Sequence, residues 1–224
     1  MAEPATLRLD MHVHTRHSPD SRNTLDGILR AMDTAGIDRV VIADHNRIEG
    51  ALRLRDLAPS RVLVGEEIKC AEGPEVIGIL LEAQIPAGTP IREACERIRE
   101  QGGVVYVPHP FDTRRSGAGA MLDDLVELVD VVEAHNARTF QVDLNQAGES
   151  WAARNGKLVG AGSDAHSLAE LGRAYMEVPP FEATRARLLA ALAAGRVGAR
   201  GTSSRAVAAY STYARVRNWV LPDR

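Results

Sequence analysis

The stretch LRLDMHVH at residues 7–14 combines a strand pattern with two histidines at its C-terminal end. Apolar side chains recur through Leu7–Val13, as expected of a buried strand. His12 and His14 are two residues apart, and the side-chain period of a strand places both imidazoles on one face. The stretch therefore predicts a buried strand that presents a pair of histidines.

Similar apolar runs recur along the chain and alternate with segments of helical period. Helices are expected at Thr24–Ala35, Thr89–Gln101, Met121–Val129 and Ala183–Ala194, with a terminal basic helix at about residues 203–219. This alternation predicts an α/β fold with a mainly parallel sheet and outer helices. About seven units without a dividing linker favour a small barrel, in a single domain over residues 1–224. The further strand runs are Val40–Ala43, Val62–Val64, Val76–Leu81, Val104–Val107, Val131–Glu133 and Leu158–Ala161.

Composition excludes several classes of protein. The chain has 224 residues, 45% of them hydrophobic, and a formal net charge of −3, so it can bury a core and is not disordered. Cys70 and Cys95 are its two cysteines, too few for a disulfide framework. It has no apolar run long enough to span a membrane and no signal-peptide pattern at residues 1–10. A cytoplasmic protein without membrane partners is expected.

Charge is unevenly distributed along the chain. Residues 183–224 hold eight arginines and one acid, Asp223, so the preceding part is acidic. The favoured interpretation is a basic terminal helix packed on an acidic body. The alternative is a nucleic-acid or other acidic partner.

The histidines gather at one expected edge of the sheet. Six of the seven follow apolar strand runs, and the C-terminal ends of parallel strands converge in barrel enzymes. Acids accompany them in Asp164-Ala165-His166, Asp44-His45-Asn46 and Glu66-Glu67. Imidazole and carboxylate without thiolate suit zinc, manganese or iron in catalytic sites, and so many ligands indicate more than one ion. The histidines are His12, His14, His17, His45, His109, His135 and His166.

These motifs, taken together, resemble the PHP family, named for polymerase and histidinol phosphatase. They occur in order over about residues 6–200. The resemblance implies a distorted barrel of seven strands that hydrolyses phosphoesters with divalent metal ions. The motifs are DMHVHT at 10–15, SPD at 18–20, ADHN at 43–46, GEEI at 65–68, HP at 109–110 and GSDAH at 162–166.

The resemblance also implies a ligand set for two or three ions, of zinc, manganese or iron. One departure concerns the strand after Glu67, where the family usually has a histidine and this chain has Glu75. Glu75 either binds the second ion through oxygen or points away and leaves that site weak. The implied ligands are His12, His14, Glu67 and Asp164 for the first ion, Glu67 and His109 for the second, and Asp20, His45 and His166 for the third.

Further residues are candidates for substrate contact and catalysis. Arg114 and Arg138 follow the expected catalytic edge, and arginine binds phosphate bidentately. His135 is a candidate substrate contact, with metal ligation or a contact to Asn136 as alternatives. His17 could protonate a leaving group and joins Glu67 and Asp164 as a catalytic candidate.

Three functions remain open at this point. The leading hypothesis is hydrolysis of a phosphomonoester or small phosphodiester, as by a histidinol or nucleotide phosphatase, because clustered divalent ions lower the pKa of bound water. The second is a nuclease acting on nucleic-acid ends, which an aromatic content of 4% disfavours. The third is a metal-binding protein with little activity. The substrate's identity and the oligomeric state stay open.

Overall fold

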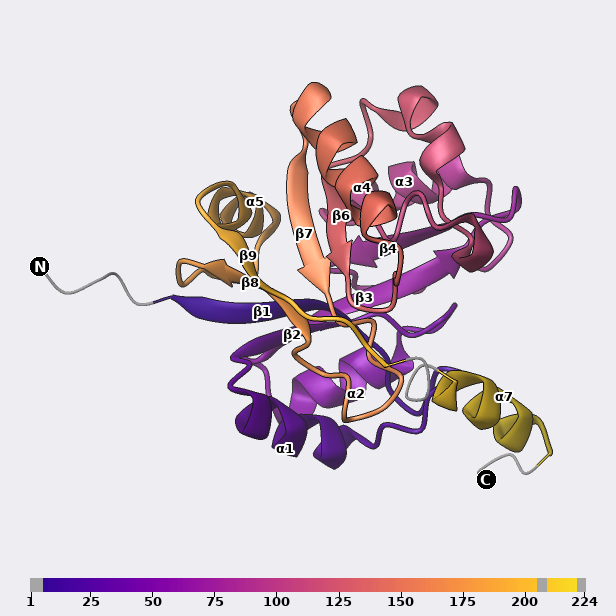
Figure 1. The fold of residues 1–224 in the computed structure, drawn as a ribbon, viewed down its shortest axis with the longest axis vertical. Helices are drawn as coiled ribbons and strands as arrows, with labels where there is room; N and C mark the ends of the chain where they lie inside the picture. Colours follow the sequence, from indigo (N-terminus) through magenta and orange to yellow (C-terminus); the bar gives the residue numbers. More distant parts are fainter. Residues whose placement is uncertain (1–5, 205–208, 221–224) are drawn as a thin grey trace, which may run out of the picture.

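The computed structural model describes residues 6–204 and 209–220, in which nine strands form one sheet in the order β7-β6-β5-β4-β3-β2-β1-β8-β9 (Figure 1). The elements, in chain order, are β1 (Leu7–Val13), α1 (Leu25–Ala35), β2 (Arg39–Ile42), α2 (Glu49–Leu57), β3 (Val62–Lys69), β4 (Glu75–Ile79), α3 (Ile91–Glu100), β5 (Val104–Val107), three 3₁₀ turns (Thr113–Arg115, Gly119–Met121, Asp123–Leu125), β6 (Val131–Asn136), α4 (Val142–Arg154), β7 (Leu158–Gly162), β8 (Ala174–Val178), α5 (Arg185–Ala193), β9 (Arg196–Arg200) and α7 (Tyr210–Val220).

The sheet curves into a nearly closed barrel, which confirms the expected α/β barrel. Closure comes from the residues after β7: the amide of His14 donates to the carbonyl of Ala165 (3.1 Å), and the amide of Ala165 donates to the carbonyl of His12 (3.3 Å). The amide of Ser163 also donates to the carboxylate of Asp10 (2.8 Å). These bonds bring the far end of the chain against the histidines of β1.

Strand direction departs from the sequence prediction. Among the described residues, four pairings are parallel (β1–β2, β2–β3, β5–β6, β6–β7) and four are antiparallel (β1–β8, β3–β4, β4–β5, β8–β9). The expectation of a mainly parallel sheet was therefore wrong, and two further strands, β8 and β9, extend the sheet beyond β1 to β7. The β3–β4 pair is antiparallel because only residues 70–74 join its strands, too few for a parallel crossover.

Alternating residues of the strands point to two apolar layers, one between the sheet and the helices and one inside the barrel. Val40 and Ile42 of β2 pack with α1 residues such as Ile28, while Val41 and Ala43 join the cluster inside the barrel. Leu9, Met11 and Tyr106 fill that interior. Because side chains alternate along a strand, polar residues at the strand ends are held at the barrel mouth by packing on both faces.

Local sequence determines the ends of some helices but not the presence of others. The Thr24 hydroxyl accepts from the Gly27 amide (3.2 Å) at the start of α1, and Gly36, with φ of 66°, ends it. The predicted helix Met121–Val129 was wrong, because that segment forms short 3₁₀ turns and Asp123 accepts from the indole of Trp151 on α4 (2.7 Å). Helices α2 and α4, which the sequence reading omitted, cover β3 and β6.

The terminal helix lies beside the barrel mouth. Of the helix predicted at about 203–219, the structure describes α7 at Tyr210–Val220, while 205–208 lie outside the described residues. Asn218 donates to the carbonyls of Pro19 (3.0 Å) and Ser21 (3.3 Å), which ties α7 to the segment after β1. Across the described ranges, no helix has the length and apolarity needed to cross a bilayer.

Candidate metal centre

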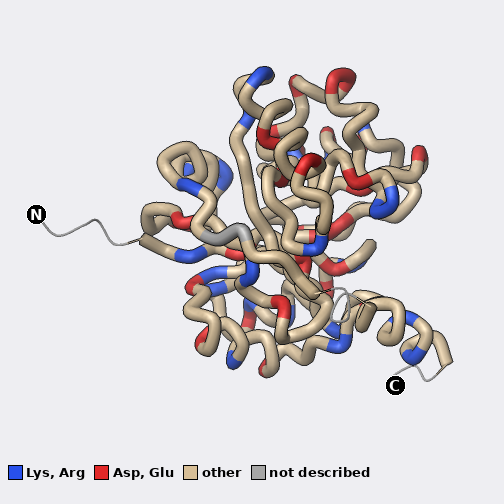
Figure 2. The backbone as a smooth tube through the Cα atoms, viewed as in Figure 1, with Lys and Arg blue, Asp and Glu red and all other residues tan. Residues whose placement is uncertain are grey.

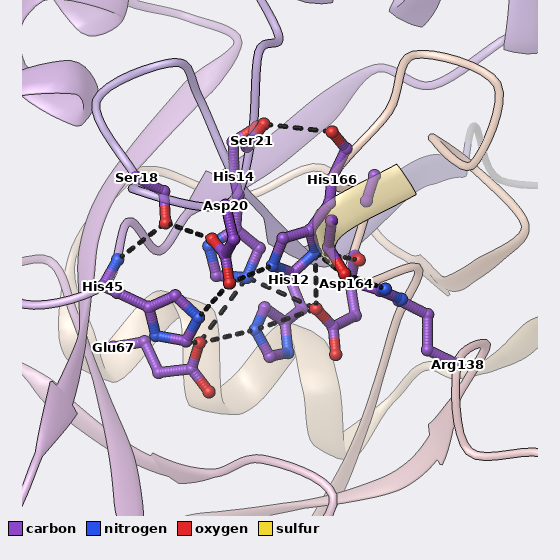
Figure 3. Close-up of polar contacts among 12 residues, drawn as sticks. His12, His14, Ser18, Asp20, Ser21, His45, Glu67, Arg138, Asp164 and His166 are labelled. Atoms are coloured by element: carbon purple, nitrogen blue, oxygen red, sulfur yellow. Dashed lines mark hydrogen bonds and ion pairs between the residues drawn. The ribbon is translucent and has the colours of Figure 1, made fainter. Parts of the chain in front are cut away.

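Nine histidine and carboxylate side chains meet at the barrel mouth in what we call the metal pocket, and Figure 3 labels seven of them. They come from β1, β3 and β4 and from the loops that follow β1, β2, β5 and β7, so segments far apart in sequence contribute to one cluster. Most of them are almost fully buried. The members of the metal pocket are His12, His14, Asp20, His45, Glu67, Glu75, His109, Asp164 and His166.

The two histidines of β1 converge on two carboxylates. His12 Nε2 lies 3.3 Å from Glu67 Oε2 and 3.8 Å from Asp164 Oδ1. His14 Nε2 lies 3.5 Å and 3.3 Å from the same two oxygens. The four side chains implied for the first ion therefore surround one point.

Glu67 also reaches toward the other side of the metal pocket. Its Oε1 lies 3.3 Å from His109 Nε2, and its Oε2 lies 3.2 Å from His45 Nδ1. Glu75 offers an oxygen to the same group as Glu67 and His109, with ligand atoms within 4.8 Å of one another. Of the two arrangements left open for Glu75, the structure has the carboxylate turned into the metal pocket, where it also lies 3.6 Å from Lys69 Nζ.

Asp20 joins the remaining two histidines. Its Oδ2 lies 3.3 Å from His45 Nε2 and 3.3 Å from His166 Nε2. The Ser18 hydroxyl donates to the other oxygen of Asp20 (2.9 Å), which fixes the carboxylate (Figure 3). This is the set implied for the third ion.

The residues present fit divalent metal ions. Two ligand atoms of a tetrahedral zinc ion lie about 3.3 Å apart, which matches many of these separations. Several buried polar atoms also have no hydrogen-bond partner of acceptable geometry, a costly state in an apolar interior unless an ion takes the lone pair. Among the described residues these atoms include both ring nitrogens of His14, Glu67 Oε1, His109 Nδ1 and Asp164 Oδ1.

Burial and neighbouring charge set the protonation of the candidate ligands. Burial, together with the nearby His166, lowers the pKa of His14 to about 3, so its ring is neutral and able to ligate. Burial opposes a charged Asp164, but Arg115 and His12 together hold its pKa well below the usual range. Glu67 has a similarly depressed pKa because His45 and His12 outweigh burial. Both carboxylates are therefore anionic.

Glu133 is a residue that the sequence reading did not assign to the site. Its Oε1 accepts from Tyr106 (2.8 Å) and lies 3.2 Å from His12 Nδ1, and its Oε2 accepts from the amide of His109 (2.7 Å) and from Asn136 (2.8 Å). A carboxylate on the far nitrogen of a ligand histidine fixes the tautomer and ring orientation. The signal in the sequence is an acid inside the apolar run Val131–Glu133.

Two candidate ligands, His109 and Asp164, have unusual backbone conformations. His109 has φ of 29° and Asp164 has φ of 53°, both in the left-handed region that non-glycine residues seldom adopt. Such conformations cluster at functional sites and persist only where the surroundings hold them. Here the Glu133 contact holds the amide of His109.

The arginines near the metal pocket are not all those expected from the sequence, which favoured Arg114 and Arg138. Arg115 pairs with Asp164 and donates to Asn136 (3.0 Å) inside the metal pocket, whereas the Arg114 side chain is 66% exposed and donates to Gln141 (2.8 Å). Arg138 Nη1 lies 2.5 Å from His166 Nδ1. The sequence pattern favoured Arg114 over its neighbour, whereas the structure brings Arg115 to the metal pocket.

The other two candidate histidines lie outside the metal pocket. His17 has Nδ1 3.6 Å from Glu49 of α2. His135 has Nε2 3.1 Å from the carbonyl of Gly201 and Nδ1 3.5 Å from Asn145.

Comparison with known proteins places this geometry in a family. The profile of a family described as PHP-associated matches residues 143–197. Uncharacterised protein MJ0417 of Methanocaldococcus jannaschii is 35% identical over 176 residues, which cover 76% of this chain and 70% of that protein. Uncharacterised protein MJ1587 of the same organism is 35% identical over 58% of this chain and 82% of its own length.

Two kinds of solved structure share the fold. A two-domain protein of Bacteroides vulgatus containing a predicted PHP-like metal-dependent phosphoesterase has a TM-score of 0.69 at 16% identity, over 94% of this chain and 70% of that one. The lesion-specific endonuclease of Pyrococcus furiosus has a TM-score of 0.61 at 14% identity, over 86% of this chain and 58% of that one.

Fold and site together define the class: an α/β barrel with histidine and carboxylate side chains that could hold metal ions gathered at its mouth. The resemblance read from the sequence motifs is confirmed. The chain belongs to the PHP family.

Proposed function

We propose that the chain hydrolyses small phosphoesters with two or three divalent ions, zinc, manganese or iron, held in the metal pocket. One observation carries this: the open cavity over the ligands, of about 380 Å³, is lined by both ligands and cations. Metal ions and guanidinium groups on the same cavity match the oxygens of a phosphate group. The cations are Lys69, Arg114, Arg115, Arg138 and Arg215.

The metal ions and the arginines would have different roles toward the phosphate group. Bound divalent ions supply Lewis acidity and a water of lowered pKa. Arg115, paired with Asp164 and donating to Asn136, presents a guanidinium beside the ligands, where it would orient a phosphate bidentately. Arg138 is held by Glu170 (3.4 Å) and by Ser211 of α7 (2.8 Å), which aims its guanidinium at the same cavity.

Leaving-group protonation by His17 is a narrower part of this proposal. His17 does not line the cavity over the ligands but a neighbouring one, against Glu49. It can act only on substrates whose leaving group extends past Asp20. His135, held by Gly201, would contact substrate only through a group that reaches β9.

The test is a substrate panel with the protein loaded with zinc, manganese or iron. We expect release of inorganic phosphate from small phosphomonoesters, and loss of that release in Arg115→Ala. Glu93→Ala is a control, because Glu93 is an exposed residue of α3 paired with Arg97 (2.6 Å). No turnover of any phosphoester with any of the three metals would reject the proposal.

A nuclease is the second candidate, and one observation favours it. The cationic rim extends from the metal pocket onto α7 through Arg215, so a strand longer than a single nucleotide could follow it. Labelled oligonucleotides in the same panel separate the two functions. Shortening of the oligonucleotide without phosphate release from small esters would favour the nuclease.

A further inference from the structure

A second cavity, of about 690 Å³, lies beside the metal pocket. Its walls are the segment 16–19 after β1, the start of α2 and the C-terminal half of α7. We call it the arginine–tryptophan cleft. The residues that define it are Arg16, Arg47, Arg53, Arg215 and Trp219.

Positive charge dominates this cleft. Four arginines and one acid, Glu49, line it, and Glu49 pairs with Arg53 at 2.6 Å. This charge also acts on His17, which lies in the cleft. Burial lowers the pKa of His17 below 6.5, and Glu49 opposes that shift. Arg53, Arg16 and Arg47 lower the pKa further. Figure 2 shows basic positions on α7 and on the chain that faces it. A cavity with this balance of charge is suited to an anion.

The cleft and the metal pocket share a wall. Arg215 lines both cavities, and its guanidinium is 2.8 Å from Asp20 Oδ2. Ser18 lines the cleft and donates to the other oxygen of Asp20. A molecule with one phosphate at the metal pocket therefore has the cleft directly beside it.

Trp219 adds an aromatic surface to the cationic one. Its side chain lines the cleft yet is 84% exposed, although an indole is among the largest apolar groups a protein can bury. The bonds from Asn218 to Pro19 and Ser21 hold the neighbouring turn of α7 in place. A planar ring stacked on Trp219 would cover this surface.

We propose that the arginine–tryptophan cleft binds the remainder of the substrate, a second phosphate on the arginines and a planar ring on Trp219. The substrate class is then a nucleotide with more than one phosphate, either free or at the end of a strand. This inference rests on the proposed function, because the metal pocket must take the other phosphate. On this proposal, α7 determines substrate specificity.

Direct binding tests the cleft independently of turnover. The chain has two tryptophans, so Trp151→Phe makes Trp219 the sole indole reporter. Stopped-flow mixing of the full chain reads fluorescence quenching before turnover, with adenosine, adenosine monophosphate and adenosine diphosphate as probes. We expect the diphosphate to bind about tenfold more tightly than the monophosphate, as one added charge-assisted contact provides. Equal affinity for all three probes would overturn the proposal.

A matched pair of variants locates the binding. Arg53 lines the cleft, whereas Arg55, two residues along α2, pairs with Asp56 at 2.9 Å. We expect Arg53→Ala to lower the diphosphate-to-monophosphate ratio of kcat/KM, and of affinity, about tenfold, and Arg55→Ala to leave both ratios unchanged. An equal effect of the two variants would overturn the proposal. If Trp151→Phe does not fold, the ratio of kcat/KM values, which needs no fluorescence reporter, is the measurement.

A short oligonucleotide distinguishes the two sources of the ligand. Tighter binding of a single strand than of the free diphosphate, with a steep salt dependence, would support the cleft and assign it to strand ends. Quenching by the diphosphate without hydrolysis of any phosphoester would keep the cleft and reject the proposed function. The two failures are therefore distinguishable.

Discussion

The metal pocket and the arginine–tryptophan cleft share Arg215 as a wall but are built in opposite ways. The metal pocket uses side chains that are mostly buried, in strands and adjacent loops, and some are held by a partner, as His12 is by Glu133 and Asp20 by Ser18. The cleft uses long, largely exposed side chains on a loop and two helices. Rigid elements place groups precisely, so the first region suits chemistry, while the second can adapt to different substrates.

The largest effect should come from removing a ligand of the metal pocket. Asp164→Ala or His12→Ala should lower turnover at least about 100-fold, because both contribute to the group around the first ion. Phosphate release with metal in excess is the measurement. Asp56→Ala, at a surface carboxylate paired with Arg55, is the control for folding and charge. Near-normal turnover of metal-replete Asp164→Ala would contradict the ligand assignment.

A smaller effect should come from the residue that orients a ligand. Glu133→Gln should weaken metal affinity roughly 10–100-fold, the range for partners of ligand histidines, because His12 loses its anionic partner. Competition with a chelator measures this. Glu127→Gln, at an exposed carboxylate that pairs with Arg92, should leave the affinity unchanged. Unaltered affinity in Glu133→Gln would show that the strand alone orients the ring.

The least stable metal is expected beside Glu75. Dialysis should remove the ion held by Glu67, Glu75 and His109 first, and Glu75→His should retain more zinc because imidazole suits zinc better than carboxylate does. Metal content per chain after dialysis is the measurement, with Glu82→His at an exposed position as the control. Full zinc retention by the parent, without gain in the variant, would show that Glu75 is not a weak ligand.

The smallest effect should be that of α7 on stability. Among its described residues only Ala214 is buried, so deletion of residues 209–224 should lower Tm by roughly 2–4 °C, as the loss of about 1 kcal/mol does in a chain of this size. Thermal unfolding followed by circular dichroism gives the answer. A fall several times larger would mean that the cleft, like the metal pocket, is part of the folding core.

The same contrast explains what the sequence could predict. Ligands such as His12 and Asp164 stand in short motifs because a buried site needs fixed residue types at fixed strand ends, and strand spacing is visible in sequence. The helix at Thr24–Ala35 was predictable for a related reason: Thr24 and Gly36 mark its ends locally.

Other features depend on contacts that no local pattern contains. Arg115 and Arg114 are adjacent and chemically identical, and only the turn at Thr113–Arg115 decides which one reaches Asp164. The helix at Val142–Arg154 lacks a strong apolar stripe and owes its place to packing against β6. The sequence did not predict the cleft, because its arginines converge from three separate segments.

The closure of the barrel through β1 has a consequence for synthesis on the ribosome. Asp10 is bonded to Ser163, 153 residues later in the chain, so at 5–20 residues per second β1 waits roughly 8–30 s for that partner. Meanwhile the β1 edge that later pairs with β8 is open to wrong partners. Arg8 and Asp10 place charges on this strand, and charges discourage edge-to-edge association. The Asp10 carboxylate that closes the finished barrel thus also disfavours wrong strand pairing by the nascent chain.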